Sequence, residues 1–183
     1  MRQMWQALDP ARERRRKRRR LTGAASAVLL ILVATQLPWS YWNADHRTAS
    51  GEIRAVTLAD GSEVVLNSGS ALNLDFSDEA RNLELVRGEL WVKVSKDANR
   101  PFSVQTRHAG ARALGTRYSV ALVRKGTRVR VQESRVSVTP RNGTQSRRLG
   151  AGQQARLTET TISAVQSTSR HPPDWTSGRL VFN

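Results

Sequence analysis

Residues 118–131 read YSVALVRKGTRVRV, and this stretch decides the fold class. Apolar side chains stand at every second position on both sides of Lys125-Gly126, namely Tyr118, Val120, Leu122, Val129 and Val131. Strict alternation is typical of half-buried β-strands, because successive side chains of a strand point to opposite faces of its sheet. The stretch therefore predicts two strands joined by a short turn.

The same period-two pattern recurs in short runs from Ile53 to Val138, and each run is bounded by turn residues. Asp60-Gly61 and Asn142-Gly143 predict hairpins, since both positions of a tight turn can take positive φ. The chain has no cysteine, which excludes disulfides and thiol-ligated zinc. We expect a mainly β domain, a sandwich or a short solenoid, whose buried side chains include Trp91, Val92, Phe102, Tyr118, Val120 and Val131.

The N-terminal region has a different character. Seven consecutive cations, Arg14 to Arg20, directly precede a charge-free run that ends at Trp42. Its apolar core, Leu21 to Leu37, is 17 residues long, near the lower limit for crossing a bilayer core of roughly 30 Å. Aromatic rings after the core suit the headgroup region. We predict one transmembrane helix over 21–42, anchored by Arg14, Arg20, Leu21, Leu37, Trp39, Tyr41 and Trp42.

The basic flank predicts the orientation of this helix. Cations beside a span stay in the cytoplasm, so the β domain is expected in the periplasm. A cleaved signal peptide is the alternative, although residues 38–42 are too bulky for a good cleavage site. The arginine run lies directly beside the span, and this position favours contact with anionic lipid headgroups over binding of nucleic acid. We therefore expect membrane attachment and no nucleic-acid partner.

The net charge of +15 is divided between two parts of the chain: residues 1–20 carry +7 and residues 43–183 carry +8. Much of the second share comes from arginines that alternate along strands, as in Arg128-Val129-Arg130-Val131. We interpret these mainly as a solvated sheet face, with a binding patch as the alternative. The composition predicts a cytoplasmic tail at 1–20, the span at 21–42, a linker at 43–50, the β domain at 51–166, a second linker at 167–174 and a strand-like segment at 175–183.

No residue pattern points to catalysis. His46, His108 and His171 stand far apart and lack zinc-protease spacing. Residues 67–70 contain Ser and Gly without the nucleophile-elbow pattern, and no phosphate-binding glycine loop is found. We therefore expect no catalytic residues, metal or cofactor.

Short motifs follow one another along the chain: Gly51-Glu52, Leu58 to Ser62, Leu66-Asn67, Arg87 to Glu89, Arg100 to Phe102, Leu114 to Val120, Val129 to Glu133 and Ala151 to Gln153. This ordered set resembles the FecR family of transmembrane sigma-factor regulators. Each motif is weak alone, but their order behind a single span is specific. The chain departs from the family pattern at Ser134, where the family usually has Gly, so that turn must tolerate a side chain. We interpret the motifs as signatures of the fold; they include Asp60, Gly61, Ser62, Asn67, Gly88, Glu89, Pro101, Phe102, Gly115 and Thr116.

The resemblance implies a relay across the inner membrane of a Gram-negative cell. An outer-membrane TonB-dependent transducer would contact the periplasmic part, and the cytoplasmic tail would regulate an extracytoplasmic-function (ECF) sigma factor, in some members in response to iron siderophores. No catalysis is needed, since signalling requires only a coupling free energy between two sites. The candidate partner contacts are Trp5, Trp175 and Phe182.

The resemblance also implies a longer cytoplasmic region and, in siderophore-responsive members, a small C-terminal domain shared with secretins and TonB-dependent receptors. Residues 175–183 resemble the first strand of that domain, cut short. We therefore expect the chain as given to relay poorly. One alternative is a membrane-anchored periplasmic module that binds an envelope component without sigma-factor regulation; another is an exported enzyme, which no motif favours.

Overall fold

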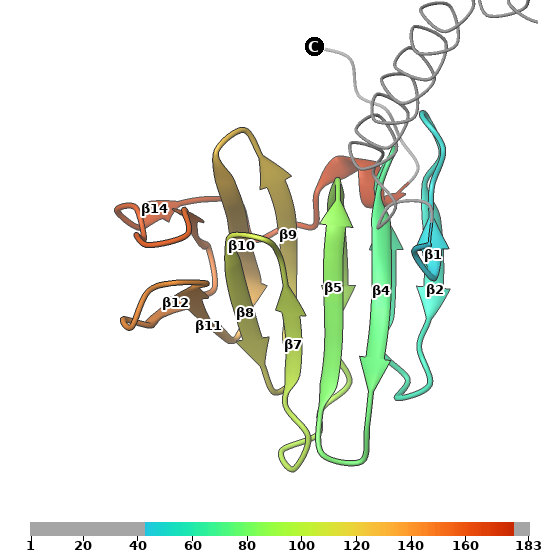
Figure 1. Ribbon diagram of the computed structural model, residues 1–183, viewed down its shortest axis with the longest axis horizontal. Coiled ribbons are helices and arrows are strands. Elements are labelled where there is room, and N and C mark those ends of the chain that lie inside the picture. Colours follow the sequence, from blue (N-terminus) through green and yellow to red (C-terminus); the bar gives the residue numbers. More distant parts are fainter. Residues whose placement is uncertain (1–42, 178–183) are drawn as a thin grey trace, which may run out of the picture. The chain divides into compact units, whose positions relative to one another are not determined.

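The computed structural model describes residues 43–177, and these form two β-sheets and one short 3-10 helix, η1 (Asp174–Ser177). The strands are β1 (His46–Arg47), β2 (Arg54–Thr57), β3 (Glu63–Leu66), β4 (Ala71–Phe76), β5 (Arg81–Arg87), β6 (Glu89–Lys93), β7 (Phe102–Gln105), β8 (Ala109–Ala113), β9 (Arg117–Val123), β10 (Gly126–Glu133), β11 (Arg135–Pro140), β12 (Arg147–Gly150), β13 (Gln153–Leu157) and β14 (Gln166–Ser167). Sheet A has the order β1-β4-β5-β7-β8-β11-β12, and sheet B has the order β14-β13-β10-β9-β6-β3-β2. Sheet A faces the viewer in Figure 1.

The hairpins are distributed over both sheets, and the chain crosses repeatedly between them. The β2–β3, β9–β10 and β13–β14 hairpins belong to sheet B, and the β4–β5, β7–β8 and β11–β12 hairpins belong to sheet A. Every paired strand runs antiparallel except β5 and β7, which are parallel because β6 lies between them in the chain but in the other sheet. The result is a sandwich in which the chain moves from layer to layer as in a solenoid, which confirms the mainly β prediction.

The alternation in the sequence decides which side chains enter the space between the sheets. Val129 and Val131 are fully buried, whereas Arg128 and Arg130 on the opposite face of β10 are partly exposed. One apolar cluster contains residues from both sheets, including the predicted core residues Val92, Phe102, Tyr118, Val120 and Val131.

Trp91 is buried as predicted, but on the other face of its sheet. Its side chain is 8% exposed but does not belong to the apolar cluster between the sheets. Trp91 stands between Leu90 and Val92 along β6, and both of these are in the cluster. The alternation of a strand therefore turns Trp91 to the other face of sheet B.

The turns follow the predicted chemistry only in part. Asp60-Gly61 does close the β2–β3 hairpin, but only Gly61 has positive φ (78°), in a three-residue loop between Leu58 and Ser62. Asn142-Gly143 lies in a longer connection between β11 and β12, and Gly143 is not among the residues with positive φ. Ser134, at the expected turn between β10 and β11, has φ 59°, so a non-glycine residue takes the left-handed conformation there.

Both predicted linkers are shorter than expected. Residues 46–47 form β1, which pairs with Ala71 and Leu72 of β4, and Gln166–Ser167 forms β14, which pairs with β13. The linker at 43–50 was predicted from its lack of periodicity, but a two-residue strand is too short to show a period. Trp175 lies in η1 and not in a strand.

The predicted tail and span, residues 1–42, and the last six residues, 178–183, lie outside the described residues. Within 43–177 no helix has the length and apolar character needed to cross a membrane. The transmembrane prediction for 21–42 therefore stays a prediction.

Candidate interaction site

A buried ion pair joins the two sheets at the β2–β3 turn. Arg81 Nη1, at the start of β5 in sheet A, donates to Asp60 Oδ2 in sheet B at 2.6 Å, and the two side chains are 0% and 3% exposed. The same nitrogen donates to the Ser95 carbonyl at 3.0 Å, while Nε and Nη2 donate to the Arg100 carbonyl at 3.0 and 2.6 Å. The guanidinium carbon lies 5.4 Å from the centroid of the Phe102 ring. Because every guanidinium nitrogen has an acceptor, burial of the charge is tolerated.

Asp60 is kept ionised in this site. Burial opposes its ionisation, but hydrogen bonds from Ser62 and the ion pair with Arg81 outweigh that effect and hold the pKa of Asp60 below its ordinary value. Ser62 donates from its backbone nitrogen and from Oγ, at 3.0 and 2.6 Å, and its Oγ accepts from the Ser95 nitrogen at 3.0 Å. The Asp60-Gly61-Ser62 motif therefore connects the β2–β3 turn to both sheets.

A second polar cluster lies around the start of β6. Ser70 Oγ and the backbone of Glu89 exchange two hydrogen bonds of 3.0 Å, and the Asn67 nitrogen donates to the Glu89 carbonyl at 2.9 Å. Thr48 Oγ1 accepts from the Ser70 nitrogen at 2.8 Å. Gly88 has φ +84°, and a Cβ there would lie 2.7 Å from Ser70 Cα, closer than real Cβ contacts. This cluster requires glycine at position 88.

The remaining motif residues also make internal contacts. The Pro101 carbonyl accepts a hydrogen bond from the backbone nitrogen of Arg81 at 3.2 Å, and the Thr116 carbonyl accepts one from the backbone nitrogen of Val94 at 2.9 Å. A Cβ at Gly115 would lie 2.6 Å from Lys96 Cγ. The motif residues thus hold strand ends and turns together, and no group of acids, bases and nucleophiles forms among them.

In the described part of the chain, no three His, Cys, Asp or Glu side chains come together in a way that could hold a metal ion. His108 and His171 have different neighbours: His108 Nδ1 lies 3.6 Å from Glu159 Oε1, and His171 Nδ1 lies 3.3 Å from Ser169 Oγ.

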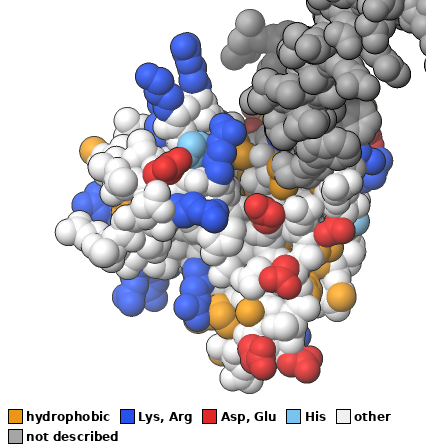
Figure 2. All heavy atoms as spheres, in the orientation of Figure 1, with side chains coloured by type: hydrophobic (Ala, Val, Ile, Leu, Met, Phe, Trp, Pro, Cys, Tyr) orange, Lys and Arg blue, Asp and Glu red, His pale blue; other side chains and the backbone are white. Residues whose placement is uncertain are grey.

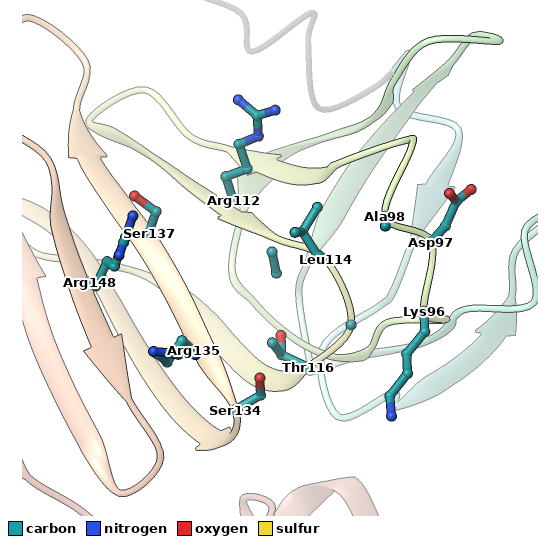
Figure 3. Close-up of a pocket in the computed structure, with 12 residues that line it drawn as sticks. Lys96, Asp97, Ala98, Arg112, Leu114, Thr116, Ser134, Arg135, Ser137 and Arg148 are labelled. Atoms are coloured by element: carbon teal, nitrogen blue, oxygen red, sulfur yellow. The ribbon is translucent and has the colours of Figure 1, made fainter.

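The most distinctive surface feature is a groove of about 710 Å³ on the outer face of sheet A. We call it the basic groove. It is lined by the cations Lys96, Arg112, Arg135 and Arg148, with Leu114 and Ser137 between them. Leu114 lies in the middle of the site, with Arg135 and Arg148 on one side and Lys96 on the other (Figure 3).

Strand register brings these arginines together. Ser137 of β11 pairs with Arg112 of β8 on one side and with Arg148 of β12 on the other, so the three side chains form one row across the sheet. Arg135 is two residues from Ser137 along β11 and therefore shares its face. The inward neighbours Val136 and Val138 belong to the core, which leaves the arginines on the solvent side.

The cations of the basic groove outnumber its one anion, Asp97, four to one. Among residues 43–177, none of the four cations makes an ion pair or a side-chain hydrogen bond; Asp97 also lines the groove, but its Oδ2 accepts from Arg100 Nε at 2.9 Å. Figure 2 shows most Lys and Arg on the part of this face that holds β8, β11 and β12, and most Asp and Glu elsewhere. The alternative of a binding patch therefore has a definite location.

The basic groove was not predicted from the sequence, although its arginines stand at outward positions of β8, β11 and β12. Pairing of β8 with β11 and β12 was needed to bring them together. Of the predicted partner contacts, Trp175 is half-buried in η1, while Trp5 and Phe182 lie outside the described residues, as do the anchor residues of the span. The anchor and partner-contact assignments stay predictions.

The class of protein defined by this geometry is a β-sandwich of two antiparallel-rich sheets around one core. The FecR protein family model matches residues 44–137, and the chain belongs to the FecR family. No curated protein matches the sequence.

Among solved structures, two crystal structures of a candidate anti-sigma factor from Parabacteroides distasonis ATCC 8503, at 1.65 and 2.50 Å resolution, share this fold. Each is 27% identical in sequence with a TM-score of 0.62, and the match covers 68% of this chain. The chain matches 60% of the length of that protein.

Proposed function

We propose that this chain is a single-pass inner-membrane regulator of an ECF sigma factor. The observation that carries the proposal is the FecR match over residues 44–137, together with the shared fold of a candidate anti-sigma factor. The basic run and apolar segment before residue 43 support an anchor with the N-terminus in the cytoplasm. The β domain then stands in the periplasm.

In this proposal the chain has one partner on each side of the inner membrane. Residues 1–20 contact the sigma factor, and the β domain receives the signal from a TonB-dependent transducer that senses an iron siderophore. The β domain supports this role as a receiving module, because its two sheets share one core and are joined by a buried ion pair. Signalling requires that the partner on one side change the free energy of association on the other side.

The orientation is tested with a reporter enzyme that is active only outside the cytoplasm, fused after Ser50. We expect activity in cells, and reduced activity when residues 14–20 are replaced by neutral residues, because the bias in cations sets the orientation. A silent periplasmic reporter together with an active cytoplasmic one at the same position would overturn the proposed topology.

The regulatory step is tested by pull-down of an ECF sigma factor encoded beside this chain, using the full 183-residue chain in non-ionic detergent. Binding that is lost on Trp5→Ala and kept on the neighbouring Gln6→Ala supports contact through the tail. Absence of binding by the full chain agrees with the expected poor relay, whereas a genome that encodes no ECF sigma factor beside this chain contradicts sigma-factor regulation and favours the envelope-binding alternative.

A further inference from the structure

We propose that the basic groove binds an extended, acidic polypeptide segment of a partner protein, with one apolar side chain of that segment packed on Leu114. The inference concerns the β domain itself. It holds whether or not the tail meets a sigma factor, so it can fail or succeed independently of the proposed function.

The spacing of the cations favours an extended chain over a compact anion. Arg112 and Arg148 are separated by two strand spacings, about 10 Å, and Arg135 stands about 7 Å along β11 from the row that joins them. A single phosphate is bound by cations that converge on it within hydrogen-bond distance. In an extended peptide, side chains on one face recur about every 7 Å, which is comparable with the backbone spacing of the three arginine positions, about 7 Å along β11 and about 10 Å across the strands.

The groove is long enough for such a segment. A second hollow of about 630 Å³ continues along β8 and β11 and shares Arg112 and Ser137 with the basic groove. Its walls include Ser103, Gly110 and Thr139, whose small side chains leave room above the sheet. From residue 135 to residue 140, β11 spans roughly 20 Å, which is the length of about six residues of an extended peptide.

The exposed side chain of Leu114 favours a polypeptide over a nucleic acid or an acidic glycan as the bound partner. At 52% exposure it is the one large hydrophobic side chain that is exposed among residues 43–177, and Ala98 and Ala113 line the groove beside it. An acidic polypeptide can place an aliphatic side chain next to its carboxylates, which gives both charge pairing and apolar burial. The backbone of a nucleic acid or of an acidic glycan offers charge without an aliphatic side chain.

The uncompensated charge gives the site its selectivity for anions. The four groove cations have no ion-pair partner among the described residues, so a bound carboxylate does not have to displace one. Charges gathered on one face also attract an acidic segment over about one Debye length, roughly 8–10 Å at moderate salt. Binding should therefore weaken as the salt concentration rises.

The test uses the full chain in non-ionic detergent and a fluorescein-labelled decapeptide of alternating Glu and Ser with one central Leu. Fluorescence anisotropy is compared for the unchanged chain, a groove variant (R112Q, R135Q, R148Q) and a matched control variant (R47Q, R124Q, R156Q). The control removes the same charge from β1, the β9–β10 turn and β13. Both variants keep the basic tail, so its non-specific attraction is equal in the two.

We expect the groove variant to bind the peptide about tenfold more weakly, as the loss of three exposed charge pairs implies, and the control to change less than about twofold. The single variants Arg135→Gln and Leu114→Ser should each weaken binding about two- to threefold, and a peptide with Gln in place of Glu should bind at least about tenfold more weakly. The single variants keep the test informative if the triple variant folds poorly.

Three results would overturn the proposal. The first is equal weakening in the groove and control variants, and the second is equal binding of the Glu and Gln peptides. The third is displacement of the peptide by single-stranded DNA or dextran sulfate at the same or lower concentration of charge, which would make the groove a general polyanion surface.

Discussion

Arg81 and the groove arginines show one type of side chain in two environments. Arg81 is fully buried and each of its guanidinium nitrogens donates to Asp60, Ser95 or Arg100. Arg112 and Arg148 lie exposed on the outer face of sheet A without a partner among the described residues. A buried cation is tolerated only when its donors are satisfied, whereas an exposed one keeps its donors available. The first kind of arginine stabilises the fold, and the second kind is free to bind.

The largest effect is expected when the buried ion pair between Arg81 and Asp60 is broken. Arg81→Ala leaves the Asp60 carboxylate buried without its cation, and we expect a loss of about 3–5 kcal/mol in the free energy of unfolding, measured by urea denaturation. Arg112→Ala is the matched control, with an expected change within about 0.5 kcal/mol. Equal losses in the two variants would show that burial does not separate these arginines.

The same pair predicts a dependence of stability on pH. The pKa of Asp60 is lower in the folded chain than its ordinary value of 3.8, so its contribution is fully present above pH 3.8 and is lost as the pH falls through the lower, folded-state pKa. The urea midpoint should decrease with acidification below that value more steeply in the unchanged chain than in Asp60→Asn. Parallel pH profiles for the two proteins would contradict this role of Asp60.

The second polar cluster is tested at Gly88. Gly88→Ala combines a left-handed φ with a Cβ that meets the backbone of Ser70, and we expect a loss of about 2–4 kcal/mol. Gly69→Ala is the control, because Gly69 also has positive φ but no atom lies within 4 Å of its added Cβ. A loss of only about 1–2 kcal/mol is expected there, and thermal unfolding of both variants measures the difference that the steric contact makes.

A smaller effect of opposite sign is expected at the edge of the basic groove. Ser134→Gly relieves a left-handed conformation at φ 59° and should stabilise the chain by about 0.5–1 kcal/mol. Ser137→Gly, in the middle of β11, should destabilise it by a similar amount, because glycine in a strand loses more conformational entropy on folding. The same sign for both substitutions in thermal unfolding would refute the assignment of strain to Ser134.

The smallest effect on stability per site is expected for the groove arginines. The groove variant R112Q, R135Q, R148Q should change the free energy of unfolding by no more than about 0.5 kcal/mol per site, since exposed positions without partners contribute little to stability. Circular dichroism during urea denaturation measures this. A loss as large as that of Arg81→Ala would place the three arginines in the fold and not in a binding surface.

The sequence predicted the residues of the internal polar clusters better than it predicted the basic groove. The motif at residues 60–62 and the glycine at 88 were recognised as features of the fold, and both lie in internal polar clusters. The partner of Asp60 was not predicted, because Arg81 is 21 residues away and belongs to the other sheet. The basic groove was missed for the same reason, since no local pattern shows which strands become neighbours.

The sequence was sufficient to predict the mainly β fold, most of the side chains that enter the core, a turn at Ser134 and the resemblance to the FecR family. These follow from local rules: the two-residue period of a strand and the conformations open to each residue type. Only the tertiary structure decided the parallel pairing of β5 with β7, the strand at His46–Arg47, the outward face of Trp91 and the row formed by Arg112, Ser137 and Arg148. Sheet order and register depend on contacts between distant residues, and those contacts are selected by packing of the whole core.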